Sequence, residues 1–302
     1  MFSRALSDKR VALRAFWQYN ISMEKSCIVL VNKIAGGFNG LNVEKLTARL
    51  NNVYERVDVV YLPDEKEPDY AGYSAVVVCG GDGTLNHLIN SSLPHDLEVF
   101  YLPSGTLNEA AGIKRAEPIS VVGEADGKLF SYVLAAGTFT PLGYSVGHKI
   151  KQRLKAFAYI MRVIKEYKVY RINAEIVADG AEFKGEYTLI MAINSPRCFG
   201  FRFNRMYSEG GDMCLLTIKS PKCRGIFGKI AIFFPFFRSF FIGYSKPHSS
   251  SSIEFRSFKE LKLSFDSAPV FCADGERVDN MNPSFYVKTH TLHYSVKIGL
   301  PE

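Results

Sequence analysis

The residues best suited to chemistry in this sequence lie in a glycine-containing loop, Gly80 to Thr84, which reads Gly-Gly-Asp-Gly-Thr. The loop follows the apolar run Ala75 to Cys79, whose β-branched residues predict a buried strand. Glycines let phosphate groups approach main-chain N–H groups and the start of a following helix, which we expect from Leu85 to Ser91. Asp82 adds a carboxylate that can hold Mg²⁺, usually through water. The pattern therefore predicts that a nucleotide binds here together with Mg²⁺.

A second loop of the same kind supports this interpretation. The strand predicted at Val99 to Leu102 is followed by Pro103 and then by Ser104-Gly105-Thr106-Leu107-Asn108-Glu109, with a helix-like segment from Leu107 to Gly112. In a parallel sheet the carboxyl ends of neighbouring strands meet at one edge, and open α/β sheets bind their ligands there. We therefore expect the two loops to lie side by side.

The elements that must position these loops change in character along the chain. Up to about residue 124, strands alternate with helices, which predicts a parallel, helix-covered sheet. The elements predicted there are strands at Cys27–Asn32, Val57–Leu62 and Ala75–Cys79 and a helix at Val43–Val53. Beyond it, alternating apolar stretches separated by turn residues predict antiparallel strands. These stretches are Tyr187–Ile193, Met213–Ile218, Ser252–Phe255 and Leu261–Phe265.

A basic helix is predicted inside this second region. Residues Lys149 to Lys168 repeat their apolar side chains with the helical period of about 3.6 residues. Eight basic residues and one acid lie between Lys149 and Arg171. A solvated helix face is the favoured interpretation, and a surface that rests on anionic lipid headgroups is the alternative.

The most apolar segment of the chain is Ile226 to Tyr244. Lys229, Pro235 and Arg238 interrupt it, so we do not expect a helix that spans a bilayer. A place in the protein core is favoured, and a lipid-facing or pocket-lining role is the alternative.

Composition limits the class of protein. The chain has 302 residues, 47% of them apolar, which suggests about two globular domains. A formal charge of +7 favours an anionic partner, but no motif for nucleic-acid recognition is present, so we expect none. The first 22 residues lack the apolar run of a signal peptide, and six scattered cysteines show no metal-site spacing. We expect a cytoplasmic protein.

Five short motifs carry a resemblance to a known family. They are Val31 to Gly37, Gly80 to Thr84 with Asn86, Gly105 to Glu109, Leu134 to Gly137, and Asp274-Gly275-Glu276. In order and spacing they resemble the diacylglycerol kinase catalytic-domain family of lipid kinases, over about residues 25 to 299. NAD kinases and phosphofructokinases share the glycine loop, whereas the late Asp-Gly-Glu, which alone would be read as a hairpin turn, favours the lipid kinases.

The resemblance implies an α/β plus all-β fold. A phosphofructokinase-like nucleotide-binding α/β domain would occupy residues 25–124, with 291–302 returning to it. A β-sandwich domain for the lipid would occupy 125–290, and the active site would lie in the cleft between the two. Residues 1–24 are expected to be an extension outside the core fold.

The resemblance also implies roles for individual residues. Asp82, Glu109 and Asp274 would form a carboxylate and water network around Mg²⁺. Asp274 is the candidate base for the lipid hydroxyl, Glu276 would support it, and Asp82 would also act in catalysis. The residues expected to contact ATP are Asn32, Lys33, Gly80, Gly81, Gly83, Thr84, Asn86, Ser104, Gly105, Thr106 and Asn108.

The implied activity is transfer of the γ-phosphoryl group of ATP to a lipid hydroxyl, with diacylglycerol and phosphatidic acid as the first choice of substrate and product. Such an enzyme would touch a membrane peripherally, and a homodimer is compatible with the sequence. An NAD kinase-like enzyme is one alternative. A catalytically inactive lipid- or nucleotide-binding protein is another, because the chain departs from the family at His87, where Glu is common, and near Val122, where Asp is common.

Overall fold

The computed structural model describes residues 25–66, 68–105, 108–111, 118–138, 140, 168–208 and 210–301. The predicted extension at 1–24, Thr106, and the predicted basic helix apart from Lys168 lie outside the described residues. The described part of the segment predicted to be helical at 107–112 is a turn instead.

The first part of the chain forms the predicted parallel sheet. Strand β1 (Ser26–Asn32) lies between β2 (Arg56–Leu62) and β3 (Ala75–Gly80), and β4 (Glu98–Pro103) pairs with β3, all in parallel. Alternate residues of β1 enter two different clusters, since successive side chains of a strand point to opposite faces. Both faces of the sheet are therefore covered.

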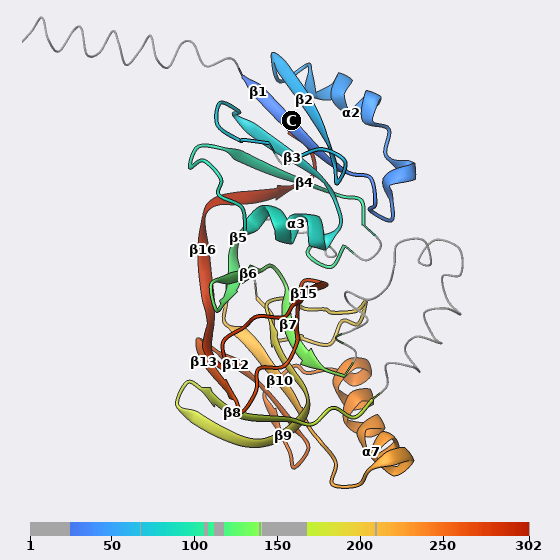
Figure 1. Ribbon diagram of the computed structural model, residues 1–302, viewed down its shortest axis with the longest axis vertical. Helices are drawn as coiled ribbons and strands as arrows, with labels where there is room; N and C mark the ends of the chain where they lie inside the picture. The colour runs from blue at the N-terminus through green and yellow to red at the C-terminus, as the bar shows by residue number, and fades with distance from the viewer. Residues whose placement is uncertain are drawn as a thin grey trace, which may run out of the picture.

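One helix covers each face (Figure 1). On one side, helix α2 (Val43–Leu50) contributes Leu46 and Leu50 to a cluster with Val29. On the other, helix α3 (Asp82–Ile89) contributes Leu85 to a cluster with Ile28. Burying each such side chain contributes about 1.5–3 kcal/mol.

The boundaries of both helices differ from the prediction. Helix α2 ends at Leu50, three residues before Val53. Helix α3 begins at Asp82 rather than Leu85, with Gly81 as its N-cap residue. The start of α3 therefore includes half of the glycine loop, and the Asp82 carboxylate lies in the first turn, where the helix dipole favours negative charge.

The second part of the chain is antiparallel, as predicted. Its path through the sheet runs β11-β12-β10-β9-β8-β13-β16, and a smaller group, β5, β6, β7, β14 and β15, pairs onto it. The bounds are β5 Ile119–Ala125, β6 Lys128–Phe130, β7 Val133–Gly137, β8 Ile172–Ala178, β9 Ala181–Ile193, β10 Met213–Lys219, β11 His248–Ser249, β12 Ile253–Phe258, β13 Glu260–Phe265, β14 Phe271–Ala273, β15 Glu276–Val278 and β16 Ser284–Ile298. A short 3-10 helix, η1, spans Phe38–Gly40.

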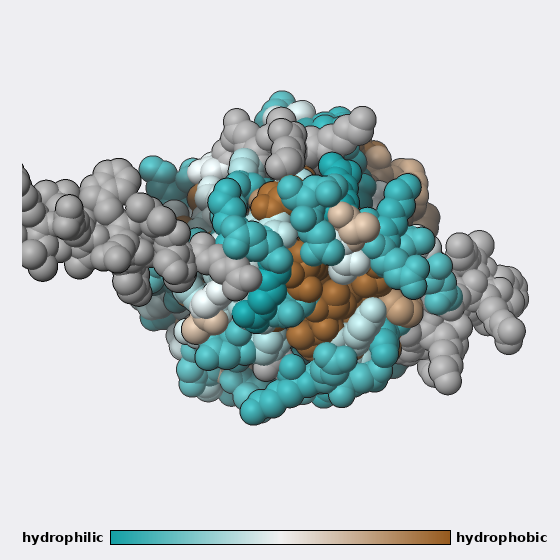
Figure 2. Space-filling model, turned by 90° about the horizontal axis from the view of Figure 1, so that it is seen from above, coloured by the Kyte–Doolittle hydropathy of each residue, from teal (hydrophilic) through white to brown (hydrophobic). Residues whose placement is uncertain are grey.

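Strand β16 joins the two parts. Its first half pairs antiparallel with β13 and β5, and Val296 to Ile298 pair in parallel with β4. The hydrogen-bonded sheet is thus continuous, and Figure 1 shows β16 running along both regions. Strand β5 runs across residue 124, where a domain boundary is expected from the sequence. That boundary stays a prediction. Seen from above, the end of the molecule is mostly hydrophilic around a central hydrophobic area (Figure 2).

The apolar segment Ile226 to Tyr244 forms helix α7 (Gly225–Phe237) and a π-helical turn, η2 (Arg238–Ile242). Its inner side, including Ile232, Phe236 and Phe240, packs into the main core. The preference for a core role is wrong for its other side, which we call the outer face. The large exposed apolar residues of the outer face are Ile226, Phe227, Ile230, Phe233, Phe234, Phe237, Phe241 and Ile242.

Candidate active site

Three loops meet at the carboxyl ends of β1, β3 and β4. Gly37 N donates to Ser104 O over 2.8 Å, and Ser104 N donates to Gly80 O over 2.7 Å. Asn32 Nδ2 donates to Thr84 Oγ1 over 2.7 Å. The loop after β1, the glycine loop and the second glycine loop are thereby fixed to one another, as the edge position of the strands predicts.

The two glycine loops approach so closely that side chains would not fit between them. A Cβ atom on Gly105 would lie 2.5 Å from Gly81 Cα, and one on Gly81 would lie 3.2 Å from Gly105 Cα. These glycines are therefore required for backbone contact between loops. Gly81 is also the N-cap residue of α3, so the main-chain N–H groups that phosphate binding at a helix start would use lie beside it.

Asp82 ties the same two loops through its carboxylate. Its Oδ2 accepts a hydrogen bond from Glu109 N over 2.8 Å, and its Oδ1 accepts one from Ala110 N over 3.0 Å. Burial raises the pKa of this carboxyl to about 6, and the nearby charges of Asp274 and Glu109 add to the rise, whereas the two backbone donors oppose it. Asp82 thus has a structural duty as well as its predicted catalytic one.

Asp274 lies in a closed cage of donors. It occupies the turn between β14 and β15 with a φ of 50° and is 1% exposed. Its Oδ1 accepts from Tyr132 N over 2.9 Å and Val133 N over 3.1 Å. Its Oδ2 accepts from Ser131 N and, over 3.0 Å, from Asn86 Nδ2. Burial raises the pKa of Asp274 while these donors lower it. The sequence Asp274-Gly275 is therefore both a hairpin turn and the position of a site carboxylate.

Glu276 is the carboxylate that stays accessible. It is the first residue of β15, and its side chain is exposed while its Oε1 lies directly against the position where Gly83 would carry a Cβ atom. The absence of a side chain at Gly83 therefore makes room for this carboxylate at the glycine loop. Of the three predicted catalytic residues, Glu276 alone has an exposed side chain.

Glu109, predicted to hold Mg²⁺, is engaged by the protein. Its Oε2 lies 2.6 Å from Arg197 Nε, and its Oε1 accepts from Gly200 N over 2.5 Å. The Glu109 side chain is 1% exposed and that of Arg197 is 23% exposed. Sequence reasoning missed Arg197. Its only signal is a single basic residue among Ser, Pro, Cys and Gly in the loop after a buried strand.

The three carboxylates do not fit a directly bound metal ion. Asp82, Glu109 and Asp274 each use both oxygens as acceptors or in an ion pair within the protein. Among the residues that the structure describes, no group of three or more His, Cys, Asp or Glu side chains could hold a metal. The predicted set is therefore a network between loops.

The other predicted ATP contacts divide into two groups. Asn86 also donates to Leu129 O over 3.1 Å, and Asn108 Oδ1 accepts from Gly105 N over 2.7 Å, so both support the loops. Lys33 instead pairs with Asp64 at 2.8 Å on the surface. Ser104 Oγ is buried and has no hydrogen-bond partner among the described residues, which leaves it available to a ligand. Thr106, as noted, lies outside them.

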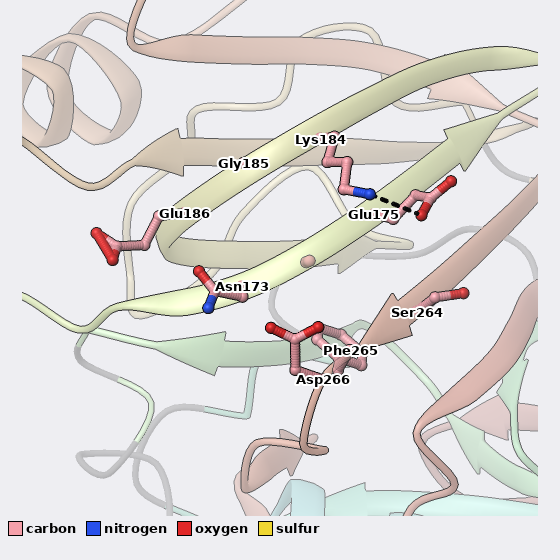
Figure 3. Close-up of a pocket in the computed structure, with 9 residues that line it drawn as sticks. Asn173, Glu175, Lys184, Gly185, Glu186, Ser264, Phe265 and Asp266 are labelled. Carbon is pink, nitrogen blue, oxygen red and sulfur yellow. Dashed lines mark ion pairs between the residues drawn. The ribbon is translucent and has the colours of Figure 1, made fainter.

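Two positions depart from the family that the sequence resembles. His87 is exposed on α3, and Val122 is buried in β5. A cavity of about 350 Å³ lies elsewhere, between β8, β9 and β13 (Figure 3). Its polar lining includes Lys184, which pairs with Glu175 at 3.7 Å. None of the site residues lines this cavity, so we do not regard it as the active site.

Comparison with known proteins finds a matching family model and several similar proteins. Residues 26–122 match the family model "Diacylglycerol kinase catalytic domain". The chain is 30% identical over 156 residues to a diacylglycerol kinase of Bacillus subtilis, covering 45% of this chain and 51% of that protein. The match thus spans about half the length of that relative. A putative lipid kinase of Streptococcus pneumoniae is 22% identical over 286 residues, covering 85% and 93%.

Solved structures support the fold. A putative diacylglycerol kinase from Bacillus anthracis superposes with a TM-score of 0.64 at 18% identity, covering 90% of this chain and 96% of that one. A second structure under the same description gives 0.64 at 17% identity, covering 91% and 97%. At this level of identity the likeness concerns the arrangement of the elements, including the parallel strands and the antiparallel region.

The raised pKa of Asp82 predicts a pH dependence of stability. Its carboxyl ionises near pH 4 in the unfolded chain and near pH 6 in the folded one, so between these values the folded state binds more protons. The free energy of unfolding from this group therefore falls as pH rises, by about 3 kcal/mol in total. Denaturant unfolding of wild type and Asp82→Asn from pH 4 to 7 measures the difference. A constant difference across this range would contradict the assignment.

The Glu109–Arg197 pair predicts a coupled loss of stability. Arg197→Ala leaves a buried carboxylate unpaired and should lower the free energy of unfolding by on the order of 3 kcal/mol. Adding Glu109→Gln should recover part of that loss, because the neutral amide needs no cation. A double-mutant cycle by denaturant unfolding tests this. Purely additive losses would show that the two side chains are not coupled.

Proposed function

We propose that this chain, whose residues 26–122 belong to the diacylglycerol kinase catalytic domain family, is an ATP-dependent lipid kinase. It would transfer the γ-phosphoryl group to a lipid hydroxyl, with diacylglycerol as substrate and phosphatidic acid as product. The names of two relatives, a diacylglycerol kinase and a putative lipid kinase, support this choice. The substrate lies in a bilayer, so the enzyme would work at a membrane surface.

One observation carries the proposal. Two glycine loops touch backbone to backbone at the carboxyl ends of parallel strands, and an exposed carboxylate from the antiparallel region reaches the first of them. Phosphoryl transfer needs positioning and charge stabilisation more than covalent chemistry. Main-chain donors on the loops and the start of α3 would position the phosphates, and the carboxylate would receive the acceptor's proton.

The exposure of Glu276 suggests which carboxylate takes the proton and which one positions the site. A general base must come within hydrogen-bond reach of the proton it takes. Glu276 is exposed beside Gly83 of the glycine loop, where an acceptor can reach it, whereas Asp274 is enclosed by four donors. We therefore assign proton transfer to Glu276 and positioning to Asp274, which exchanges the two roles expected from the sequence. Asp82 would hold the loops together.

Magnesium would enter with the nucleotide. ATP phosphates and water satisfy most of the ligand positions of Mg²⁺. This agrees with carboxylates that are occupied by protein donors in the described structure.

The direct test is phosphoryl transfer from labelled ATP into a panel of lipids in mixed micelles, with NAD as a further acceptor. Glu276→Gln should lower kcat by about 10²–10⁴-fold and leave the melting temperature within about one degree, since its side chain is exposed. Asp274→Asn should lower stability by about 1–3 kcal/mol, because an amide N–H₂ would face main-chain donors.

Three results would count against this assignment. Full activity in Glu276→Gln would remove it as the base. Labelling of NAD alone would replace the lipid by a ribose hydroxyl. If ATP bound but no acceptor were labelled, the chain would be a binding protein.

Removal of metal tests whether Mg²⁺ arrives with the nucleotide or is held by the protein itself. We expect a chelator to abolish transfer without changing the melting temperature of the nucleotide-free protein, because the described part of the chain has no cluster of side chains that could hold an ion. Thermal unfolding with and without chelator measures this. A clear drop in melting temperature would show that the protein itself holds a metal.

A further inference from the structure

The largest unexplained surface is the outer face of α7 and η2. The structure has eleven large apolar side chains that are exposed among its described residues, and eight of them lie between Ile226 and Ile242. Phe227 is 71% exposed and Phe234 is 69% exposed. Soluble proteins seldom expose a contiguous apolar patch of this kind unless something binds to it.

The pattern along the helix separates two apolar sides. Exposed positions recur as 226, 230, 233, 237 and 241, while Ile232, Phe236 and Phe240 face the core. Spacings of three and four residues place each set on one side of a helix. A helix that is apolar all round is normally buried all round, so the outer face calls for an occupant.

Charge indicates the chemistry of that occupant. From Met213 to Ile253 the chain contains six Lys and Arg residues and no Asp or Glu. They are Lys219, Lys222, Arg224, Lys229, Arg238 and Lys246. Lys222 and Arg224 are exposed just before the first turn of α7. Phenylalanine beside basic side chains, in a stretch of sequence that contains no acid, matches an anionic lipid surface.

The helix is placed to lie on a bilayer rather than to cross it. Gly225–Ile242 is the one helix among the described residues that is long and apolar enough to span, by length and composition. Crossing would require Ile232, Phe236 and Phe240 to leave the core cluster that they share with strand residues such as Leu216. Figure 1 shows α7 on the outside of the antiparallel region, and the exposed side chains of its outer face point away from the core.

This surface connects to the candidate active site through aromatic contacts. Phe241 packs on Phe201 with ring centroids 4.9 Å apart, and Phe240 packs on Phe203 at 5.1 Å. Phe201 exchanges backbone hydrogen bonds with Cys198, in the loop whose Gly200 and Arg197 hold Glu109. The helix that would meet lipid is thus in contact with the loop that fixes a site carboxylate.

We propose that the outer face of α7 and η2 docks the protein on a bilayer that carries anionic headgroups. The proposal rests on the lipid kinase assignment only for the reason why the protein would dock on a bilayer. The docking itself can be measured without catalysis. The aromatic side chains enter the interfacial layer and the basic residues face the headgroups. The docked helix places the site loop close to the membrane that supplies the substrate.

The test is co-sedimentation of the full chain with phosphatidylcholine vesicles and with vesicles that also contain phosphatidylglycerol. Wild type should bind the anionic vesicles better. Phe227→Ser/Ile230→Ser should weaken that binding by at least about tenfold. Lys222→Glu/Arg224→Glu should weaken it on anionic vesicles alone. Tyr286→Ser, which removes a 50% exposed aromatic from β16, is the matched control and should bind as wild type does.

Two further measurements separate the outcomes. Equal vesicle binding by wild type and Phe227→Ser/Ile230→Ser would overturn the proposal. Light scattering supplies the second test. If wild type were a dimer, and Phe227→Ser/Ile230→Ser were a monomer that still bound vesicles as wild type does, the occupant of the outer face would be a second copy of the chain and the proposal would be overturned. Activity on lipid in mixed micelles should survive in Phe227→Ser/Ile230→Ser. Absence of that activity in wild type would refute the kinase assignment while leaving the binding result intact.

Discussion

A buried carboxylate must be met by hydrogen-bond donors, and the site of this protein is built around that requirement. Asp274 receives its donors from Ser131 to Val133 and from Asn86 on α3. Asp82 receives its donors from the second glycine loop. Each carboxylate therefore joins segments that are far apart in sequence, and moving one segment would leave a charge unsatisfied. The two glycine loops and the antiparallel region are held in position by these bonds.

Glu109 shows how this chain neutralises a third buried charge. The hydrogen bond from Gly200 satisfies Oε1, and the Arg197 guanidinium compensates the charge at Oε2 through an ion pair. Arginine suits this place because its charge is permanent. The price is that the loop carrying Arg197 becomes part of the site, so that packing against that loop, including Phe201, is transmitted to Glu109.

The sequence was sufficient for features governed by local pattern. The β-branched run at Ala75 to Cys79 and the glycines after it led to β3 and its loop, and the positions of the two glycine loops after neighbouring strands led to their contact. Features decided by tertiary contacts could not be predicted from the sequence. Helix α3 begins early because Asp82 finds partners in another loop. The apolar composition of Ile226 to Tyr244 favoured the core but could not say that only one side of α7 is covered. Arg197 had no motif because its partner lies 88 positions away.

The position of β16 has a consequence for synthesis of the protein on the ribosome. Strand β4 pairs with β3 on one side and with Val296 to Ile298 on the other, so its second edge stays open until β16 is made. An open apolar edge strand is a template for pairing with other chains. The first four parallel strands can therefore pair before the open edge of β4 is covered by β16. Between these two steps the nascent chain is most exposed to misassembly.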